Sequence, residues 1–324
     1  MTFRIGLLGA SRIAPPAVIA PAATDPDFTV TAVAARDPAR ARAYAAEHGV
    51  PGVADGYAEL IARDDVDVVY NALPPAAHAE WSIAALEAGK AVLCEKPFCR
   101  DAAEARAMTA ASERTGRPLL EAAHYRFHNV MLKAREIVES GALGRLTRAS
   151  ASFNVPIART ETELRWSAHQ GGGALMDLGF YPLHALRTLL AAEPKVVGAE
   201  CVVVDGVDAA TQATLSFDGV PAMLECSMTA EGFTATLVVE GEKGDLEIRN
   251  YVGPQMGCRF TTTIGGETTV LPTDGPTTYA AQLRHLADVL HGRCGPLTGG
   301  ADAVANMTAI DAIYRAGGKP DFPK

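Results

Sequence analysis

The stretch TFRIGLLGASRIA, residues 2–14, decides how the first part of the chain folds. It begins with a mostly apolar run, as in a buried strand, and Gly9 follows where the chain must turn. A helical pattern comes next, in which Pro15 and Pro16 are compatible only with the first turn. The stretch therefore predicts a strand, a tight turn and a helix, which is the start of a βαβ unit.

The same alternation of strand and helix continues to about residue 121. Valine-rich or otherwise apolar runs end in turn residues, and alanine-rich segments with helix start and stop signals separate them. Strands that are apolar throughout and joined by helices are typical of a parallel sheet covered on both faces. We therefore predict a doubly wound α/β domain over residues 1–121, with strands at 2–10, 28–36, 66–74, 91–96 and 118–124.

After residue 121 the pattern changes to strands in which apolar and polar residues alternate, which is typical of an antiparallel sheet. We expect a second domain over residues 122–324, of α+β type with a mostly antiparallel sheet. Its predicted strands lie at 145–153, 196–204, 209–217, 221–229, 234–241 and 245–250, and its predicted helices at 133–144, 174–190, 278–292 and 301–316.

Composition excludes several classes of function. The net charge of −9 disfavours a nucleic-acid partner, and no apolar run approaches the length of a membrane span. The N-terminus enters a strand at once and has no export signal, so we expect a cytoplasmic protein. The six cysteines form no C-x-x-C pair and lie beside no histidines at zinc spacing, so we expect reduced thiols and no metal site.

The turn after the first strand partly fits a dinucleotide-binding site. The template G-x-G-x-x-G/A falls on Gly9, Ser11 and Ala14, so a serine replaces its second glycine. By itself the match is weak, and a purely structural glycine turn explains it equally well. Its place at the start of a βαβ pattern favours the dinucleotide, and the Ser11 hydroxyl could bind a phosphate oxygen.

The end of the second strand indicates which dinucleotide is preferred. An acidic residue there binds the ribose hydroxyls of NAD, whereas an arginine accommodates the 2′-phosphate of NADP. Here Arg36 comes before Asp37, which favours NADP over NAD. The alternative is that Arg36 is only solvated and that Asp37 caps the helix that begins at Pro38; capping by Asp37 is compatible with both.

Two further strand ends carry polar residues to the same edge, where ligands lie in this architecture. The third strand leads to Leu73, Pro74 and then His78, which either contacts a cofactor or simply belongs to the next helix. The fourth strand ends in Glu95 and Lys96, directly before a proline. A rigidly mounted ammonium beside a nicotinamide could hydrogen-bond a substrate hydroxyl and assist removal of its proton.

In the second half, Asp177, Tyr181 and His184 follow the run Gly171-Gly172-Gly173. If residues 174–190 form a helix, Asp177 and Tyr181 stand at i and i+4 on one face. Together they form a candidate proton-transfer group, in which a neighbouring cation would have to lower the tyrosine pKa from about 10. The alternative is a buried tyrosine bonded to the aspartate for structure alone, and we expect His184 to be structural.

These motifs together resemble the glucose–fructose oxidoreductase / inositol dehydrogenase / MocA family over nearly the whole chain. The resemblance covers GLLGASRIA, NALPPAAHAEWSIAALEAGKAVLCEKPF, HYRFHN, GRLTR and GGGALMDLGFYPL, and the E-K-P element is its most specific part. It implies an N-terminal Rossmann domain and a C-terminal domain with an open-faced sheet through which homodimers or homotetramers form. It also implies hydride transfer between NAD(P) and a secondary alcohol.

The resemblance carries residue roles onto this chain. It implies that Lys96, Tyr181 and Asp177 are catalytic, with a tyrosine where inositol dehydrogenases have histidine. This is the pattern of the branch similar to dihydrodiol dehydrogenase and NADP xylose dehydrogenase. We expect the cofactor, NADP with NAD as the alternative, to contact Gly9, Ser11, Arg12, Ile13, Arg36, Leu73, Pro74, His78, Glu95, Lys96, Arg126 and Trp166.

The function expected from these residues is an NADP-dependent oxidoreductase acting on a sugar, cyclitol or trans-diol, a small molecule. Two alternatives stay open: redox-neutral glycoside cleavage with a tightly held NAD, and a dinucleotide-binding regulator without turnover. The presence of both Lys96 and Tyr181 counts against the regulator. The loop at 154–170, expected to line the pocket, has no interpretable substrate pattern, and Trp166 is compatible with simple packing.

Overall fold

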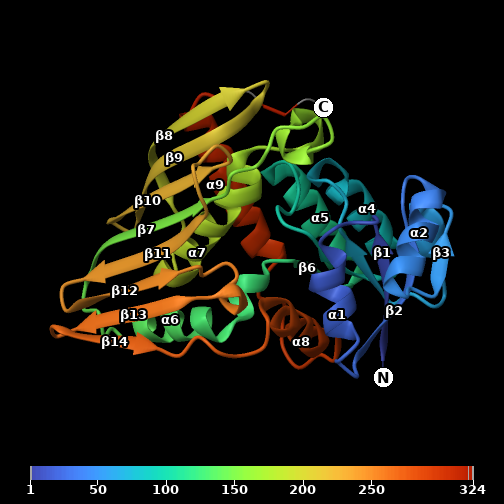
Figure 1. The fold of residues 1–324 in the computed structure, drawn as a ribbon, viewed down its shortest axis with the longest axis horizontal. Helices are drawn as coiled ribbons and strands as arrows, with labels where there is room; N and C mark the ends of the chain where they lie inside the picture. Colours follow the sequence, from blue (N-terminus) through green and yellow to red (C-terminus); the bar gives the residue numbers. More distant parts are fainter. Residues whose placement is uncertain (1, 320, 323–324) are drawn as a thin grey trace. The chain divides into compact units, whose positions relative to one another are not determined.

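The computed structural model describes residues 2–319 and 321–322. The chain forms two compact units, the first of residues 1–123 and 279–307 and the second of residues 124–278 and 308–324. Each unit is built around its own sheet (Figure 1). The expected combination of a doubly wound parallel sheet and a second, mostly antiparallel sheet is confirmed.

The sheet of the first unit has six parallel strands in the order β3-β2-β1-β4-β5-β6. The order reverses between β1 and β4, so their carboxyl ends form the crevice where ligands bind in such folds. The central strands are buried on both faces, which explains their continuous apolar sequences. The strands are β1 (Phe3–Leu8), β2 (Phe28–Ala34), β3 (Gly52–Ala54), β4 (Val68–Asn71), β5 (Ala91–Cys94) and β6 (Leu119–Glu121).

Five strands of this sheet were predicted, and the sixth, β3, was missed. It has only three residues and pairs with β2 at the edge of the sheet, so its sequence has no room for a strand pattern. The helices of the unit are α1 (Ala20–Ala22), preceded by a π-helical turn at Pro15–Ile19, α2 (Pro38–His48), α3 (Tyr57–Ala62), α4 (Pro75–Glu87), α5 (Ala102–Thr115) and α8 (Thr278–Leu290).

The units do not follow a single cut in the sequence. From Tyr279 on, α8 belongs to the first unit, although residues 122–324 were expected to form one domain. Its residues Leu283, Leu286 and Val289 lie in the same core cluster as Leu7 of β1. Burial of this apolar stripe stabilises the docking of α8. The sequence did not indicate that the chain comes back to the first unit, because α8 follows the strands of the second unit without a change of pattern.

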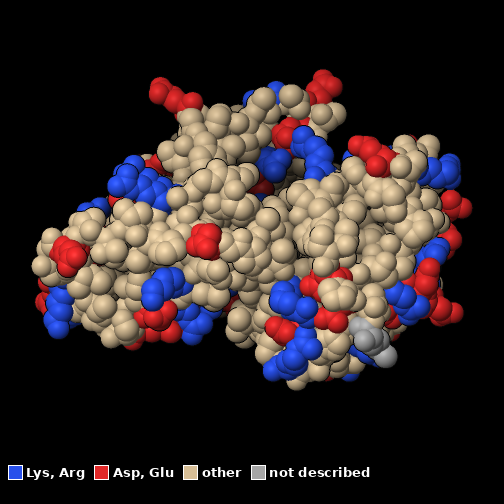
Figure 2. All heavy atoms as spheres, turned by 60° about the horizontal axis from the view of Figure 1, so that its bottom comes forward, with Lys and Arg blue, Asp and Glu red and all other residues tan. Residues whose placement is uncertain are grey.

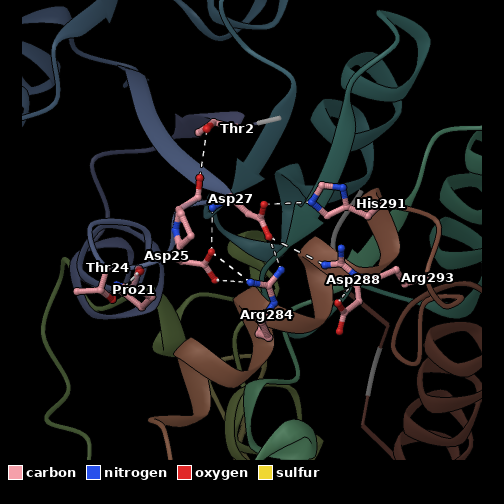
Figure 3. A network of polar contacts seen from close by, with 10 residues as sticks. Thr2, Pro21, Thr24, Asp25, Asp27, Arg284, Asp288, His291 and Arg293 are labelled. Carbon is pink, nitrogen blue, oxygen red and sulfur yellow. Dashed lines mark hydrogen bonds and ion pairs between the residues drawn. The ribbon is translucent and has the colours of Figure 1, made fainter.

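A polar network fixes the outer side of α8. Figure 3 shows Asp25 and Asp27, before β2, facing Arg284, His291 and Arg293. Arg284 forms ion pairs with both aspartates, and His291 Nε2 lies 3.1 Å from Asp27 Oδ1. The hydrogen bonds from Arg284 and His291 lower the pKa of Asp27 to about 2. The network therefore ties the late helix to the first strands of the unit.

The sheet of the second unit has eight strands in the order β14-β13-β12-β11-β7-β10-β9-β8. All neighbours are antiparallel except β7 and β10, which run parallel. The two strands that come last in the sequence, β13 and β14, were not predicted. The strands are β7 (Leu146–Asn154), β8 (Lys195–Val204), β9 (Val207–Phe217), β10 (Val220–Ser227), β11 (Thr234–Gly241), β12 (Gly244–Arg249), β13 (Arg259–Ile264) and β14 (Glu267–Leu271).

Helices cover one face of this sheet, and α7 packs against β7 and β10 (Figure 1). Burial alternates along β10, as the alternating sequence predicts, so that alternate side chains point to the helices and to the open face. The helices are α6 (Asn129–Glu139), α7 (Phe180–Leu190) and the second part of α9 (Gly300–Ala316), with 3₁₀ turns at His124–Phe127, Leu164–Trp166, Ala168–Gln170 and Pro254–Met256 and a π-helical turn at Leu175–Gly179.

Candidate functional site

The turn after β1 requires glycine at position 9. Gly9 has φ +96, in the left-handed region. A Cβ at this position would lie 3.2 Å from a Leu73 methyl carbon and 3.3 Å from the Ala72 carbonyl oxygen. The backbones of the β1 and β4 exits therefore approach each other closely, as a dinucleotide-binding turn needs.

Helix α2 holds the same turn from the other side. Arg40 donates a hydrogen bond to the Ala10 carbonyl at 2.8 Å, and the Tyr44 hydroxyl donates to the Ser11 carbonyl at 2.9 Å. The Ser11 hydroxyl accepts from the Ala14 N–H at 3.2 Å. A hydroxyl that accepts one bond still carries its own proton, so Ser11 can donate to a phosphate.

At the end of β2, the arginine and the aspartate have separate tasks. Asp37 is the N-cap of α2, and its carboxylate accepts from the Ala39 N–H at 2.9 Å. Arg36 is exposed, and its guanidinium takes part in no ion pair within residues 2–319 and 321–322. Arg12, in the glycine turn, is also exposed. These side chains fit a dinucleotide that carries an extra phosphate on its ribose.

The exits of β4 and β5 are joined by polar contacts. His78 of α4 is 1% exposed, and its Nε2 lies 2.7 Å from the Leu73 carbonyl oxygen. Its Nδ1 lies 2.9 Å from the Pro97 carbonyl oxygen. The Asn71 side chain accepts from the Leu73 N–H and donates to the His78 carbonyl. Both ring nitrogens of His78, a predicted cofactor contact, therefore lie against backbone carbonyls.

Glu95 and Lys96 follow β5 directly and are half-buried. Glu95 accepts a hydrogen bond of 2.6 Å from the buried Tyr70 hydroxyl of β4, and also accepts from the Lys96 N–H. Burial, together with this carboxylate, raises the pKa of Tyr70 well above its usual value. The Glu95 N–H also donates to the Asn71 carbonyl of β4 at 2.9 Å, so the neighbouring strand holds the backbone just before the lysine. The Lys96–Pro97 peptide bond is cis.

In the second unit, the Tyr181 hydroxyl has a partner that the sequence did not reveal. It lies 3.0 Å from His124 Nε2, and His124 Nδ1 lies 2.9 Å from the Thr278 hydroxyl. Gln255 donates to that same hydroxyl at 3.2 Å. Tyr181 and His124 are both buried. His124 lies inside the motif HYRFHN, but only the fold brings it to Tyr181.

Asp177 is paired with a cation. Its carboxylate accepts from Arg165 Nε at 2.5 Å, and Arg165 also binds Glu163 at 2.9 Å. The first residues of the predicted helix, Leu175–Gly179, form a π-helical turn, so the α-helical spacing used to place Asp177 and Tyr181 on one face does not hold there. The position of the Asp177 carboxylate is instead set by Arg165, which lies in the preceding loop.

A buried aspartate supports the glycine run before Asp177. Asp208 accepts hydrogen bonds from the Leu175 N–H at 2.7 Å, from Thr211 and, at 2.8 Å, from the Tyr314 hydroxyl. A Cβ on Gly173 would lie only 2.2 Å from the Asp208 carboxylate, so glycine is needed there. Burial raises the pKa of Asp208. Asp208 could not be found from the sequence because it falls in the predicted turn between the strands at 196–204 and 209–217, where an acidic residue is ordinary.

Other predicted residues have structural contacts of their own. Trp166 donates to the Ile157 carbonyl at 3.1 Å, which fits the packing alternative. His184 accepts or donates a 2.6 Å bond with the Tyr125 hydroxyl and stacks on Phe180, as expected for a structural residue. Arg126 lies half-buried in the same 3₁₀ turn as His124.

The described part of the chain shows no group of three or more residues arranged to bind a metal ion. Burial raises the pKa of the Cys94 and Cys99 thiols well above the usual value, which disfavours thiolate chemistry beside Lys96. No helix among residues 2–319 and 321–322 has both the length and the apolar sequence to span a bilayer. On the face shown in Figure 2, basic and acidic side chains are interspersed.

The structure thus brings the predicted residues together in two groups, one in each unit. Gly9, Leu73, His78 and Lys96 lie around the β1, β4 and β5 exits of the first unit. In the second unit, Tyr181 lies at the start of α7 and Asp177 in the π-helical turn before it, each bonded to a separate partner. The first group suits a dinucleotide, and the second offers a phenol and a carboxylate for proton transfer and substrate binding.

Residues 3–123 match the family model described as "Oxidoreductase family, NAD-binding Rossmann fold", and residues 131–247 match the "GFO/IDH/MocA C-terminal domain". The chain is 36% identical to dTDP-3,4-didehydro-2,6-dideoxy-alpha-D-glucose 3-reductase of Streptomyces violaceoruber, over 97% of this chain and 95% of the relative. It is 32% identical to D-xylose 1-dehydrogenase (NADP(+)) 2 of Haloferax volcanii, over 96% of each. The structure of an aldose-aldose oxidoreductase from Caulobacter crescentus superimposes with a TM-score of 0.90 at 28% identity, covering 98% of both chains.

Proposed function

Because the chain belongs to the GFO/IDH/MocA family of NAD(P)-dependent oxidoreductases, we propose that it uses NADP to interconvert a secondary alcohol and a carbonyl. The substrate would be a sugar, a cyclitol or a trans-diol. The observation that carries this proposal is the buried phenol of Tyr181, which lies at the start of α7 and is hydrogen-bonded to His124. A phenol oriented in this way is a proton donor and acceptor for an alcohol oxygen.

Each residue of the two groups has a role in this proposal. The bound nicotinamide supplies or accepts the hydride. Tyr181 exchanges the proton of the substrate oxygen, and His124 orients its phenol. Lys96 donates a hydrogen bond to the reacting group of the substrate beside the nicotinamide. Asp177 binds a substrate hydroxyl, and Arg165 orients its carboxylate.

The preference for NADP is supported by Arg36. Its exposed guanidinium follows β2, where the ribose lies in this architecture, and Asp37 is engaged in capping α2. Arg36→Ala should therefore weaken NADPH binding about tenfold or more and leave NADH binding nearly unchanged. The measurement is the dissociation constant of each dinucleotide by nucleotide fluorescence. An equal loss for both dinucleotides would contradict the role of Arg36.

The substrate class rests on the relatives, one named for a keto-sugar nucleotide and another for xylose. The test is a panel of sugars, cyclitols, trans-diols and their carbonyl counterparts with NADP and NAD, followed by nicotinamide absorbance. We expect turnover with NADP on at least one member. A cofactor that copurifies without net reduction would instead indicate redox-neutral glycoside cleavage, and binding without any turnover would indicate a regulator.

A homodimer or homotetramer through the second sheet is supported by its open face. Val197 and Met223 are exposed on β8 and β10, at 65% and 47%. An apolar sheet face of this kind is commonly covered by a second copy. Light scattering should give a multiple of the chain mass, and Met223→Lys with Val197→Lys should reduce it to a monomer. A wild-type monomer would contradict this arrangement.

A further inference from the structure

His78 is a buried polar side chain to which the proposed reaction assigns no task. It lies in α4, which connects β4 to β5, and is 1% exposed. Its two ring nitrogens reach carbonyl oxygens on two different loops. Nε2 lies 2.7 Å from Leu73, just after β4, and Nδ1 lies 2.9 Å from Pro97, just after β5.

Both loops matter to the candidate site. A Cβ at Gly9 would lie 3.2 Å from a Leu73 methyl carbon, so Leu73 packs against the glycine turn. Pro97 follows Lys96 directly in the sequence. The imidazole therefore bridges the turn suited to the dinucleotide and the segment that carries the lysine. Asn71 of β4 donates a hydrogen bond to the His78 carbonyl and so holds the backbone that carries the imidazole.

The chemistry of the ring makes the bridge specific. A carbonyl oxygen only accepts hydrogen bonds, so both partners require N–H donors. A neutral imidazole has one donor and an imidazolium has two. Burial lowers the pKa of His78 and so favours the neutral ring, and the carbonyls of Leu73, Pro97 and Phe98 oppose that shift because donation to both loops needs the imidazolium. A residue with one oxygen or one amine could not reproduce this pair of contacts.

We propose that His78 is a positioning residue, which sets the place of Lys96 relative to the bound dinucleotide by joining the loops after β4 and β5. The inference rests on the proposed function, since it needs Lys96 to act in turnover. It differs from the two interpretations left open by the sequence. A cofactor contact would need one of the ring nitrogens, and each of them already lies against a carbonyl oxygen. Replacement of a purely structural histidine would lower stability without separating cofactor affinity from turnover.

Two conservative variants divide the bridge into its halves. The amide nitrogen of asparagine can replace Nδ1, and that of glutamine can replace Nε2. His78→Asn keeps the bond to Pro97 and loses the bond to Leu73. We therefore expect its kcat to stay within about threefold of wild type while its affinity for NADPH falls about tenfold. His78→Gln keeps the bond to Leu73, so we expect nearly normal NADPH affinity and a kcat reduced about tenfold or more.

Ser82→Ala is the matched control, because Ser82 is equally buried in α4 and bonds Asn71 at 3.0 Å. It should lower the thermal midpoint without separating affinity from kcat. If His78→Asn and His78→Gln lose affinity and kcat in the same proportion, or neither, the inference is wrong. Lys96→Met is measured alongside: if that variant keeps its turnover, the proposed function itself fails, whatever the histidine variants do.

A measurement on the wild-type protein does not depend on the variants folding. With ¹⁵N-labelled histidine, nuclear magnetic resonance should show a His78 ring N–H that exchanges slowly with solvent and is unchanged when NADP⁺ is added. A ring N–H that exchanges freely, or one whose hydrogen bond is replaced on addition of NADP⁺, would overturn the positioning role.

Discussion

The two groups of site residues are positioned in different ways. In the first unit, Lys96 and Leu73 stand at strand ends, and their loops are held through backbone carbonyls by a histidine only 5 and 19 residues away. In the second unit, Tyr181 is held by His124, 57 residues earlier, which in turn meets Thr278, 154 residues later. The first arrangement follows from local sequence, whereas the second exists only after the chain has folded.

This difference predicts how the two groups respond to substitution. Replacement of a side chain at a strand end should lower kcat and leave the stability of the fold nearly unchanged. Side chains that are held by distant partners should show coupled losses, because a removed partner leaves a buried polar group unsatisfied. The following experiments test this comparison, in order of decreasing expected effect.

Lys96→Met should reduce kcat by about 10²–10⁴-fold and leave NADPH affinity and thermal stability nearly unchanged. The reason is that the Lys96 N–H donates to the Glu95 carboxylate and the Pro97 carbonyl contacts His78, and both contacts remain when the side chain of Lys96 is replaced. Steady-state kinetics and nucleotide titration provide the measurement.

Lys90 gives a matched control at the other end of β5. Its ammonium donates to the Arg63 and Val66 carbonyls, both at 2.8 Å. Lys90→Met should therefore lower the free energy of unfolding by about 1–3 kcal/mol and leave kcat unchanged. If Lys90→Met impaired kcat as severely as Lys96→Met, Lys96 would have no special part in turnover.

His124→Ala should reduce kcat about tenfold, because it removes the imidazole that lies 3.0 Å from the Tyr181 hydroxyl and so loosens the orientation of the phenol. His124→Gln places an amide nitrogen near the position of Nε2 and should restore most of the loss. Kinetic parameters of both variants decide the matter. Equal activity of the alanine variant and wild type would show that Tyr181 needs no orientation by His124.

Asp208→Asn should destabilise the second unit by about 1–3 kcal/mol, because its new amide N–H groups face donors from Leu175, Thr211 and Tyr314. Urea unfolding monitors this loss. Tyr314→Phe removes just one of the three donors and should cost less. An asparagine variant as stable as wild type would mean that the glycine run does not depend on this carboxylate.

The smallest effect concerns the network around Asp27. Its pKa in the folded protein is lowered to about 2 from 3.8, so its contacts with Arg284 and His291 contribute stability above its unfolded pKa. That contribution is lost as the pH falls through about 2. Asp27→Asn should lower the thermal midpoint at neutral pH, and the difference from wild type should vanish near pH 2. A pH-independent difference would contradict this assignment.

Much of the fold could be predicted because its signals are local. Continuous apolar strands, the proline that begins α2 and the glycine exits of the helices define the first sheet without knowledge of any long-range contact. The short β3 and the strands β13 and β14 were missed. β14 is almost wholly exposed, and its threonines carry no alternation of apolar and polar residues.

The site divides in the same way. Gly9 and Lys96 could be found from the sequence because strand ends of a parallel sheet meet at one edge. His124, Asp208 and the Arg165–Asp177 pair could not be found. A π-helical turn replaces the expected helix start at Asp177, and nothing in the local sequence announces that change.

The central claim is the proposal that Lys96 and Tyr181 serve the same chemical step, and a double-mutant cycle tests it most directly. Turnover would be measured for Lys96→Met, Tyr181→Phe and the double variant, on the best substrate from the panel. Residues that work as a unit are strongly non-additive, so the double variant should be about as slow as the slower single variant. Losses that multiply, or a Tyr181→Phe enzyme with normal turnover, would contradict the account.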